Sequence, residues 1–265
     1  MLPEINIGPI TLQTFGTMFA LGFIAAAALV SVRLKELGKR TDYAYEMIFA
    51  ALIGGFLGAR IHFLIMNAGD VAADPIGTAF SGTGLIWFGG AVGGFLGVAL
   101  WGYWRGMLNL KLFDMAVAPL ALGYAVGRVG CQLSGDGDYG VAWSGPWAMA
   151  YPDGTVPIDE TVHPTPIYES LAMGMVAFVL WQWRDRFKPG ILFAFYLVFA
   201  GTERFLIEFI RRNDEVLGGL TQAQLMSLAM MIGGLVWIWL KSRQGSIERE
   251  DYRAARVPSA AQPAT

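Results

Sequence analysis

The chain has 265 residues, of which 55% are hydrophobic and only 15% are charged, and its formal net charge at pH 7 is −2. This excess of apolar residues, with a mean hydropathy of +0.47, is typical of integral membrane proteins and not of soluble globular domains. The nearly balanced charge gives no electrostatic basis for a nucleic-acid partner. A single cysteine, Cys131, excludes an internal disulfide.

Seven apolar segments follow one another along the chain, each close to the ~20 residues that a helix needs to cross a bilayer. None alternates with the period of two that marks barrel strands. The sequence therefore predicts an all-α, polytopic membrane helix bundle that forms one domain over residues 1–241. The predicted helices cover residues 13–32, 43–66, 84–104, 112–133, 165–183, 190–210 and 221–240.

The basic residues of the loops predict the orientation of these helices. Lysine and arginine occur in the first, third and fifth loops and in the C-terminal tail, and they are absent from the second and fourth loops, residues 67–83 and 134–163. Because cytoplasmic loops are enriched in these residues, the N-terminus is expected outside and the C-terminus inside. Residues 1–12 are expected to form a short outer segment, and residues 242–265 a disordered cytoplasmic tail.

Small residues recur where the predicted helices should meet. The sequence GGFLG occurs at 54–58 and again at 93–97, and small residues four positions apart allow helix backbones to approach closely. The sequence FGG at 88–90 interrupts the start of the third span, where a broken helix could line a cavity.

Arg128 ends the fourth span within GYAVGRVGCQLSGDGDYG, residues 123–140. Cations at membrane depth are costly, so they usually face a cavity or a partner. The glycines after Arg128 permit tight turns and offer N–H groups to an anion, whereas Asp136 and Asp138 oppose a simple anion cradle. These aspartates could orient Arg128, bind a substrate hydroxyl or act as a base; an exposed acidic turn is the alternative.

Three charged residues of the sixth span, Arg204, Glu208 and Arg211, are spaced at i, i+4 and i+7 and are predicted to share one helix face. Glu208 can hold the arginines by charge-assisted hydrogen bonds and leave a guanidinium fork for a phosphate. An internal network of salt bridges is the alternative. Glu203 is adjacent in sequence and is predicted to point elsewhere.

Further polar residues enter from the predicted outer side. Arg60, near the outer end of the second span, either extends to the interface or contacts a phosphate or carboxylate. The sequence HPTPIYE, 163–169, opens the fifth span, with His163 at the interface, where it could move protons near neutral pH. Together these residues indicate a phosphate-bearing substrate from the outer leaflet. No Cys/His cluster has metal-ligand spacing, so neither a metal nor another cofactor is predicted.

The order of these motifs resembles the prolipoprotein diacylglyceryl transferase family over residues 12–235. The similar segments are GAR at 58–60, FGG at 88–90, GRVG at 127–130, HPTPIYE at 163–169, RFLIEFIRR at 204–212 and LTQAQLMSLAM at 220–230. The resemblance implies transfer of the diacylglyceryl group of phosphatidylglycerol to the lipobox cysteine thiol in a prolipoprotein signal peptide. It also implies a multi-pass protein of the bacterial inner membrane, surrounded by membrane lipids, with 134–163 as a periplasmic loop.

The resemblance assigns roles to individual residues. It implies that Arg128 and Arg204 contact the donor phosphate and form, with Asp136 and His163, the candidate catalytic set. The candidate substrate-binding residues are Arg60, Gly127, Gly130, Tyr168, Glu169, Glu208 and Arg211. Gln224 and Ser227 match a polar pair in the family's last helix.

The chain departs from the family pattern at several polar positions. Phe88 replaces a histidine, and Cys131 and Asp136 replace an asparagine and a glutamate. One interpretation is a transferase in which Asp136, Asp138 or His163 handles the thiol proton. The alternative is a divergent paralogue that binds phosphatidylglycerol or a similar lipid with a different acceptor or without catalysis. A small-anion transporter is disfavoured, because the sequence shows no convincing pair of repeated halves.

Overall fold

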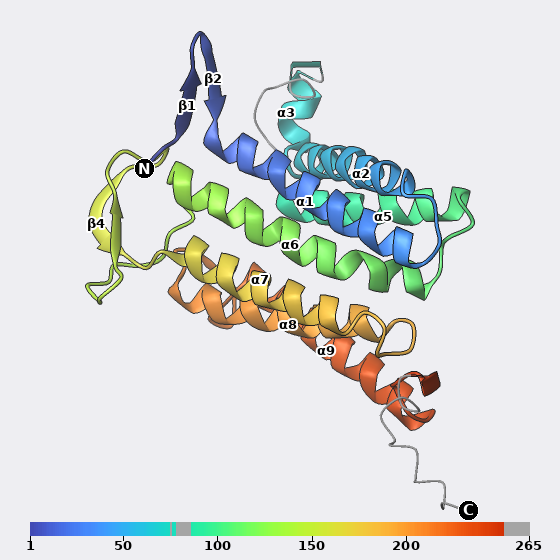
Figure 1. The fold of residues 1–265 in the computed structure, drawn as a ribbon. Helices are drawn as coiled ribbons and strands as arrows, with labels where there is room; N and C mark the ends of the chain where they lie inside the picture. The colour runs from blue at the N-terminus through green and yellow to red at the C-terminus, as the bar shows by residue number, and fades with distance from the viewer. Residues whose placement is uncertain (75, 78–85, 252–265) are drawn as a thin grey trace, which may run out of the picture. The chain divides into compact units, whose positions relative to one another are not determined.

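The computed structural model describes residues 1–74, 76–77 and 86–251 (Figure 1). Seven helices of at least 17 residues dominate this part of the chain, and four of them, α1, α2, α6 and α9, are long and apolar enough to cross a membrane. The seven are α1 (Thr14–Glu36), α2 (Tyr43–Met66), α5 (Trp87–Trp104), α6 (Leu110–Ser134), α7 (Thr165–Gln182), α8 (Ile191–Ile207) and α9 (Gln222–Arg243). A short helix, α3 (Ala68–Ala73), follows α2. The chain is thus a mostly helical, polytopic membrane protein.

The helices group into two compact units within the single domain that the sequence predicted. One unit comprises Met1–Ala26 and Phe113–Thr265, and the other comprises Ala27–Leu112. The division falls within α1 and near the start of α6.

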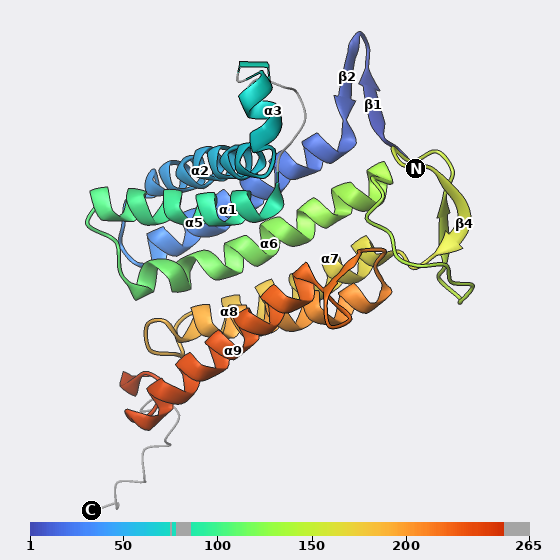
Figure 2. The same cartoon turned by 180° about the vertical axis from the view of Figure 1, so that it is seen from behind.

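In the unit Ala27–Leu112, α2 and α5 lie side by side along their glycines (Figures 1 and 2). A Cβ atom added to Gly93 would lie only 2.8 Å from the Cα of Gly58, so the two backbones are in direct contact. The predicted close packing of the two GGFLG segments is therefore confirmed. The predicted interruption at 88–90 is wrong, because α5 begins at Trp87 and continues through these residues.

Replacing Gly93 with alanine is expected to destabilise the protein by about 1–3 kcal/mol, because the added methyl group overlaps the backbone of α2. Gly90 is the matched control: a Cβ there would meet the carbonyl oxygen of Gly55 at 3.5 Å, an ordinary contact, and alanine favours a helix. Thermal unfolding in detergent should show a lower Tm for Gly93→Ala and an unchanged or higher Tm for Gly90→Ala. Equal shifts in both variants would contradict this packing.

In the other unit, α7, α8 and α9 lie side by side (Figures 1 and 2). α7 and α8 also share a core with α6. Its buried residues are mostly small: Ala121, Ala125, Met173, Ala177 and Ala200. Asp114, near the start of α6, accepts hydrogen bonds from the backbone N–H groups of Gly190 (2.6 Å) and Phe193 (2.9 Å). These bonds satisfy amide groups at the N-terminus of α8 that have no partner within the helix.

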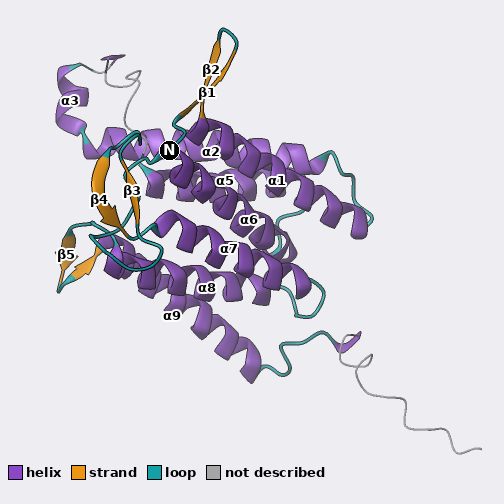
Figure 3. Cartoon of the chain, turned by 60° about the vertical axis from the view of Figure 1, so that its left-hand side comes forward, coloured by secondary structure: helices purple, strands orange, loops and turns teal. Residues whose placement is uncertain are grey.

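Three two-stranded antiparallel sheets lie at one end of the helices of this unit, where the sequence predicted only loops (Figure 3). The first is the N-terminal hairpin, so the segment predicted only as a short outer stretch has regular structure. The strands are β1 (Glu4–Ile7) with β2 (Ile10–Gln13), β3 (Met149–Tyr151) with β4 (Ile158–Val162), and β5 (Glu215–Leu217) with β6 (Leu220–Thr221).

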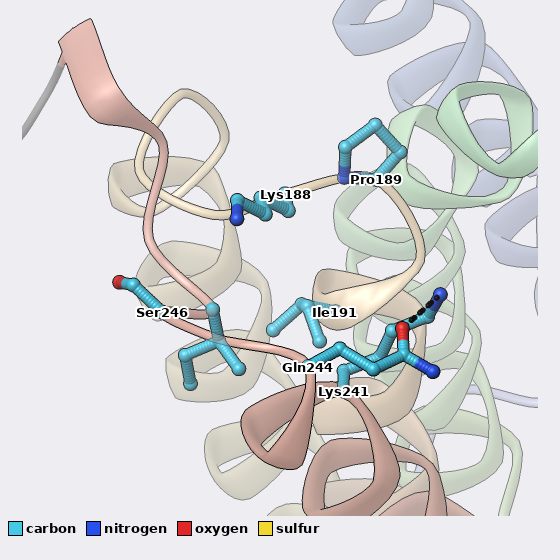
Figure 4. A pocket seen from close by; sticks show the side chains of 7 residues that line it. Lys188, Pro189, Ile191, Lys241, Gln244 and Ser246 are labelled. Carbon is cyan, nitrogen blue, oxygen red and sulfur yellow. Dashed lines mark hydrogen bonds between the residues drawn. The ribbon is translucent and has the colours of Figure 1, made fainter.

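The segment after α9, which the sequence predicted as a disordered tail, contacts the loop between α7 and α8. The N–H group of Lys188 donates to the carbonyl of Ile247 (2.9 Å), and Arg186 pairs with Glu248 at 2.6 Å. A cavity of about 240 Å³ lies beside this segment, with Lys188 and Lys241 among its lining residues (Figure 4). The remainder of the predicted tail, 252–265, is outside the described residues.

Candidate active site

Arg128 lies at the centre of a polar cluster formed by α6, α7 and the loop after α6. Its Nε atom is 2.9 Å from a carboxylate oxygen of Glu169 and donates to the Tyr124 hydroxyl at 3.0 Å. Its Nη1 atom pairs with the Asp138 carboxylate and donates to the Cys131 sulfur at 3.6 Å. These four partners fix the orientation of the guanidinium group.

Two further arginines join the same cluster. Arg204 pairs with Glu169 at 3.1 Å and with Glu208 at 2.8 Å. Arg211 donates to the Asp138 carboxylate at 2.5 Å, and it lies 3.7 Å from Glu169 and 3.8 Å from Glu208. The predicted grouping of Arg204, Glu208 and Arg211 is confirmed. The predicted single helix face is wrong, because α8 ends at Ile207 and Arg211 follows a 3-10 turn in an extended conformation.

The carboxylates are held as firmly as the arginines. The side chain of Glu169 is 0% exposed, and the Tyr124 hydroxyl donates to it at 3.3 Å. Glu208 accepts hydrogen bonds from Asn213 (2.7 Å) and Thr221 (2.8 Å). By contrast, the side-chain exposure of the arginines is 26% for Arg204, 14% for Arg128 and 10% for Arg211. Arg204 therefore presents the most accessible guanidinium of the three.

The residue that caps the start of α9 is hydrogen-bonded to the cluster. Thr221 forms a capping box with Gln224, in which the Thr221 hydroxyl accepts from the Gln224 N–H (3.2 Å) and the Gln224 side chain accepts from the Thr221 N–H (3.0 Å). The polar residues noted in the last predicted helix are buried, and Gln224 has a structural role as this cap. The same Thr221 hydroxyl that caps α9 also binds Glu208.

Asp138, and not Asp136, is the aspartate that pairs with the arginines. Gly135 and Gly137 have φ angles of +61° and +94°, which L side chains rarely adopt, and this turn directs Asp138 toward Arg128 and Arg211. Asp136 instead accepts a hydrogen bond from the Asp138 N–H at 3.2 Å. Burial alone would raise the pKa of Asp138, but the positive charges of Arg128 and Arg211 outweigh it and lower that pKa. Asp138 is therefore ionised at neutral pH and is a poor proton acceptor.

His163 lies in an aromatic cluster of the segment between α6 and α7. Its ring stacks on Trp143 with the centroids 4.3 Å apart, and its Nδ1 atom is 3.3 Å from the Tyr168 hydroxyl. That hydroxyl also accepts from the Nε1 atom of Trp147 at 2.7 Å. None of the ion pairs of the arginine cluster that join described residues involves His163. His163 and Tyr168 thus contact each other. Tyr168 directly precedes Glu169 in sequence, but among the described residues its hydrogen bonds are with the aromatic cluster and not with the arginines.

The remaining predicted site residues have different surroundings. A Cβ on Gly130 would lie 2.8 Å from Met18 Cβ, so this glycine permits contact between α6 and α1. Gly127 has no atom within 4 Å of such a Cβ among the described residues. Arg60 belongs to the other unit, where its guanidinium lies 5.1 Å from the centre of the Phe63 ring.

One group of described side chains has the ligand types and spacing of a metal site. Potential ligand atoms of Cys131, Asp136 and Asp138 lie within 4.8 Å of one another. The guanidinium of Arg128 contacts two of these three side chains, however, and its positive charge disfavours a metal cation there. The geometry supports a phosphate-binding cluster better than a metal centre.

Comparison with known proteins identifies the family of the chain. A sequence model described as prolipoprotein diacylglyceryl transferase matches residues 4–240, nearly the whole chain. The chain belongs to the prolipoprotein diacylglyceryl transferase family. All three arginines of the cluster and their partners Asp138, Glu169 and Glu208 lie within the matched region.

Individual prolipoprotein diacylglyceryl transferases are similar over most of their length. A phosphatidylglycerol–prolipoprotein diacylglyceryl transferase of Aliivibrio fischeri (strain ATCC 700601 / ES114) is 32% identical, covering 92% of each chain. One from Vibrio vulnificus (strain CMCP6) is 35% identical over 87% of each. One from Clostridium tetani (strain Massachusetts / E88) is 31% identical over 83% of this chain and 90% of its own. The similarity thus spans the helices of both units.

Proposed function

We propose that this chain transfers the diacylglyceryl group of phosphatidylglycerol to the lipobox cysteine thiol of prolipoproteins, forming a thioether and releasing glycerol phosphate. Membership of the family supports the reaction. The observation that carries the assignment of the site is the set of three arginines held together by Glu169, Glu208 and Asp138.

The arginine cluster suits the charge changes of this reaction. The phosphodiester of the donor has one negative charge, and the phosphate gains a second when its bond to the glyceryl carbon breaks. Guanidinium groups fixed in advance stabilise this developing charge more strongly than the charge of the bound donor, which lowers the barrier. Arg204 is placed to receive the phosphate because it is the most exposed of the three, with Arg128 beside it across Glu169.

The carboxylates of the cluster keep the arginines in place before the donor binds. Glu169 touches all three guanidinium groups, at distances of 2.9, 3.1 and 3.7 Å, and has no exposed surface of its own. The orientation of the arginines is therefore established by the fold, and little reorganisation is required when the phosphate arrives.

We further propose that all seven long helices span the bacterial inner membrane, with the N-terminus in the periplasm and the C-terminus in the cytoplasm. The basic residues of the odd-numbered loops and of the tail support this orientation. The arginine cluster then lies near the periplasmic ends of α6 and α8, where donor lipid from the outer leaflet and the signal peptide of a translocated prolipoprotein both have access.

A two-substrate assay tests the proposed function. Purified protein in detergent is incubated with phosphatidylglycerol and a lipobox peptide, and release of glycerol phosphate is followed. Release that needs both substrates, and that stops when the peptide cysteine is replaced by serine, is expected. Binding of phosphatidylglycerol without any release would instead support the lipid-binding paralogue.

A further inference from the structure

Glu203 precedes Arg204 of the arginine cluster in sequence and has one buried carboxylate oxygen, but it forms none of the cluster's ion pairs. Its Oε1 atom is buried, and no hydrogen bond or ion pair reaches it from the described residues. A buried carboxylate oxygen without a hydrogen bond is costly, so its retention in the fold calls for a functional explanation. The adjacent Arg204, by contrast, forms ion pairs with two glutamates.

The charged and titratable groups that act on Glu203 come from α6, α7, α8 and the turn after α8. It interacts electrostatically with Tyr124 and Arg128 of α6 and with Glu169 of α7. From its own chain segment, Tyr196, Arg204 and Arg211 act on it. Glu203 is therefore near enough to the arginines and to Glu169 for their charges to act on it, although the sequence predicted that it points elsewhere.

The other carboxylates of the region are already bound to guanidinium groups. Asp138 bridges Arg128 and Arg211, Glu169 holds three arginines, and Glu208 holds Arg204. Protonation of any of these would break an ion pair that positions the phosphate-binding groups. Glu203 alone among these four can gain and lose a proton without disturbing those pairs.

We propose that Glu203 is the proton acceptor for the thiol of the acceptor cysteine, an inference that rests on the proposed transferase function. The thiol S–H bond breaks, its proton passes to the Glu203 carboxylate, and the thiolate lone pair forms the new S–C bond to the glyceryl carbon. The C–O bond to the phosphate breaks at the same time, and its electron pair leaves with glycerol phosphate. The leaving phosphate, now doubly negative, takes the proton from Glu203, which restores the carboxylate.

Glu203→Gln tests this assignment because glutamine keeps the shape of the side chain and removes its ability to accept a proton. The kcat for transfer is expected to fall by about 10²–10⁴-fold, while the KM for phosphatidylglycerol stays within about threefold. The wild-type kcat should decline toward low pH as Glu203 becomes protonated, and this decline should be absent from the variant. Glu203→Asp, which retains a carboxylate, should recover part of the activity.

Glu215→Gln is the matched control, since Glu215 lies exposed in the hairpin after the cluster and should leave kcat unchanged. Thermal unfolding of each variant shows whether it is folded. Wild-type kcat in folded Glu203→Gln would overturn the assignment while leaving the transferase function intact. Lost activity with an unchanged acid limb of the pH profile would also overturn it, because it would indicate a purely structural role. An inactive wild-type protein would instead overturn the proposed function itself.

Discussion

Arg128→Ala is expected to reduce the rate of glycerol phosphate release by about 10²–10³-fold, the effect of removing one fixed donor to a developing oxyanion. The residue contacts four side chains of the cluster, so its guanidinium is oriented before the donor binds. Arg128→Lys should also lose most of the activity, because one ammonium group cannot reproduce the planar set of N–H donors. Initial rates measured with phosphatidylglycerol and a lipobox peptide give both values.

The control for this prediction is Arg243→Ala. Arg243 is an exposed arginine in the last turn of α9, where its guanidinium lies 4.0 Å from the centre of the Trp239 ring. Its loss should leave the transfer rate unchanged. Comparable rates for Arg128→Ala and Arg243→Ala, in folded proteins, would show that Arg128 does not stabilise the leaving phosphate.

Glu169→Ala is expected to destabilise the protein by about 3–5 kcal/mol, because it leaves buried guanidinium groups without their common partner. The carboxylate has no exposed surface and pairs with both Arg128 and Arg204. A large decrease in Tm during thermal unfolding in detergent is the measurement, and activity should be lost together with the orientation of the arginines.

Glu160→Gln provides the comparison. Glu160 is 58% exposed and lies 3.6 Å from Arg212, and exposed pairs of this kind contribute at most about 1 kcal/mol. Its Tm should therefore remain close to that of the wild-type protein. A Glu169→Ala variant with an equally small change in Tm would mean that the buried cluster does not depend on this carboxylate.

The seven helices were predictable from the sequence because membrane helices are marked by long apolar runs. The bounds of α2, for example, coincide with the predicted residues 43–66. The hairpins were not predictable in the same way, since strands as short as Glu215–Leu217 contain too few residues to show an alternating pattern. The pairing of residues 247–249 with the loop between α7 and α8 depends on contacts distant in sequence, which composition does not reveal.

The arginines of the candidate site were predictable because isolated cations in apolar segments are rare. Choosing between Asp136 and Asp138 was not, since the direction of each carboxylate depends on two glycines with positive φ angles. Tyr124 could have been identified from its position one helical turn before Arg128, where the two side chains share a face. Glu203 was assigned to a separate face from helix geometry alone, which does not account for the contributions of α6 and α7.

The most direct test of the proposed transferase function is the mass of the acceptor peptide after incubation with purified protein and phosphatidylglycerol. The proposed transferase predicts that the lipobox peptide gains the mass of one diacylglyceryl group, located on its cysteine. An unchanged peptide mass, with folded protein that still binds phosphatidylglycerol, would contradict the proposed transfer to the cysteine.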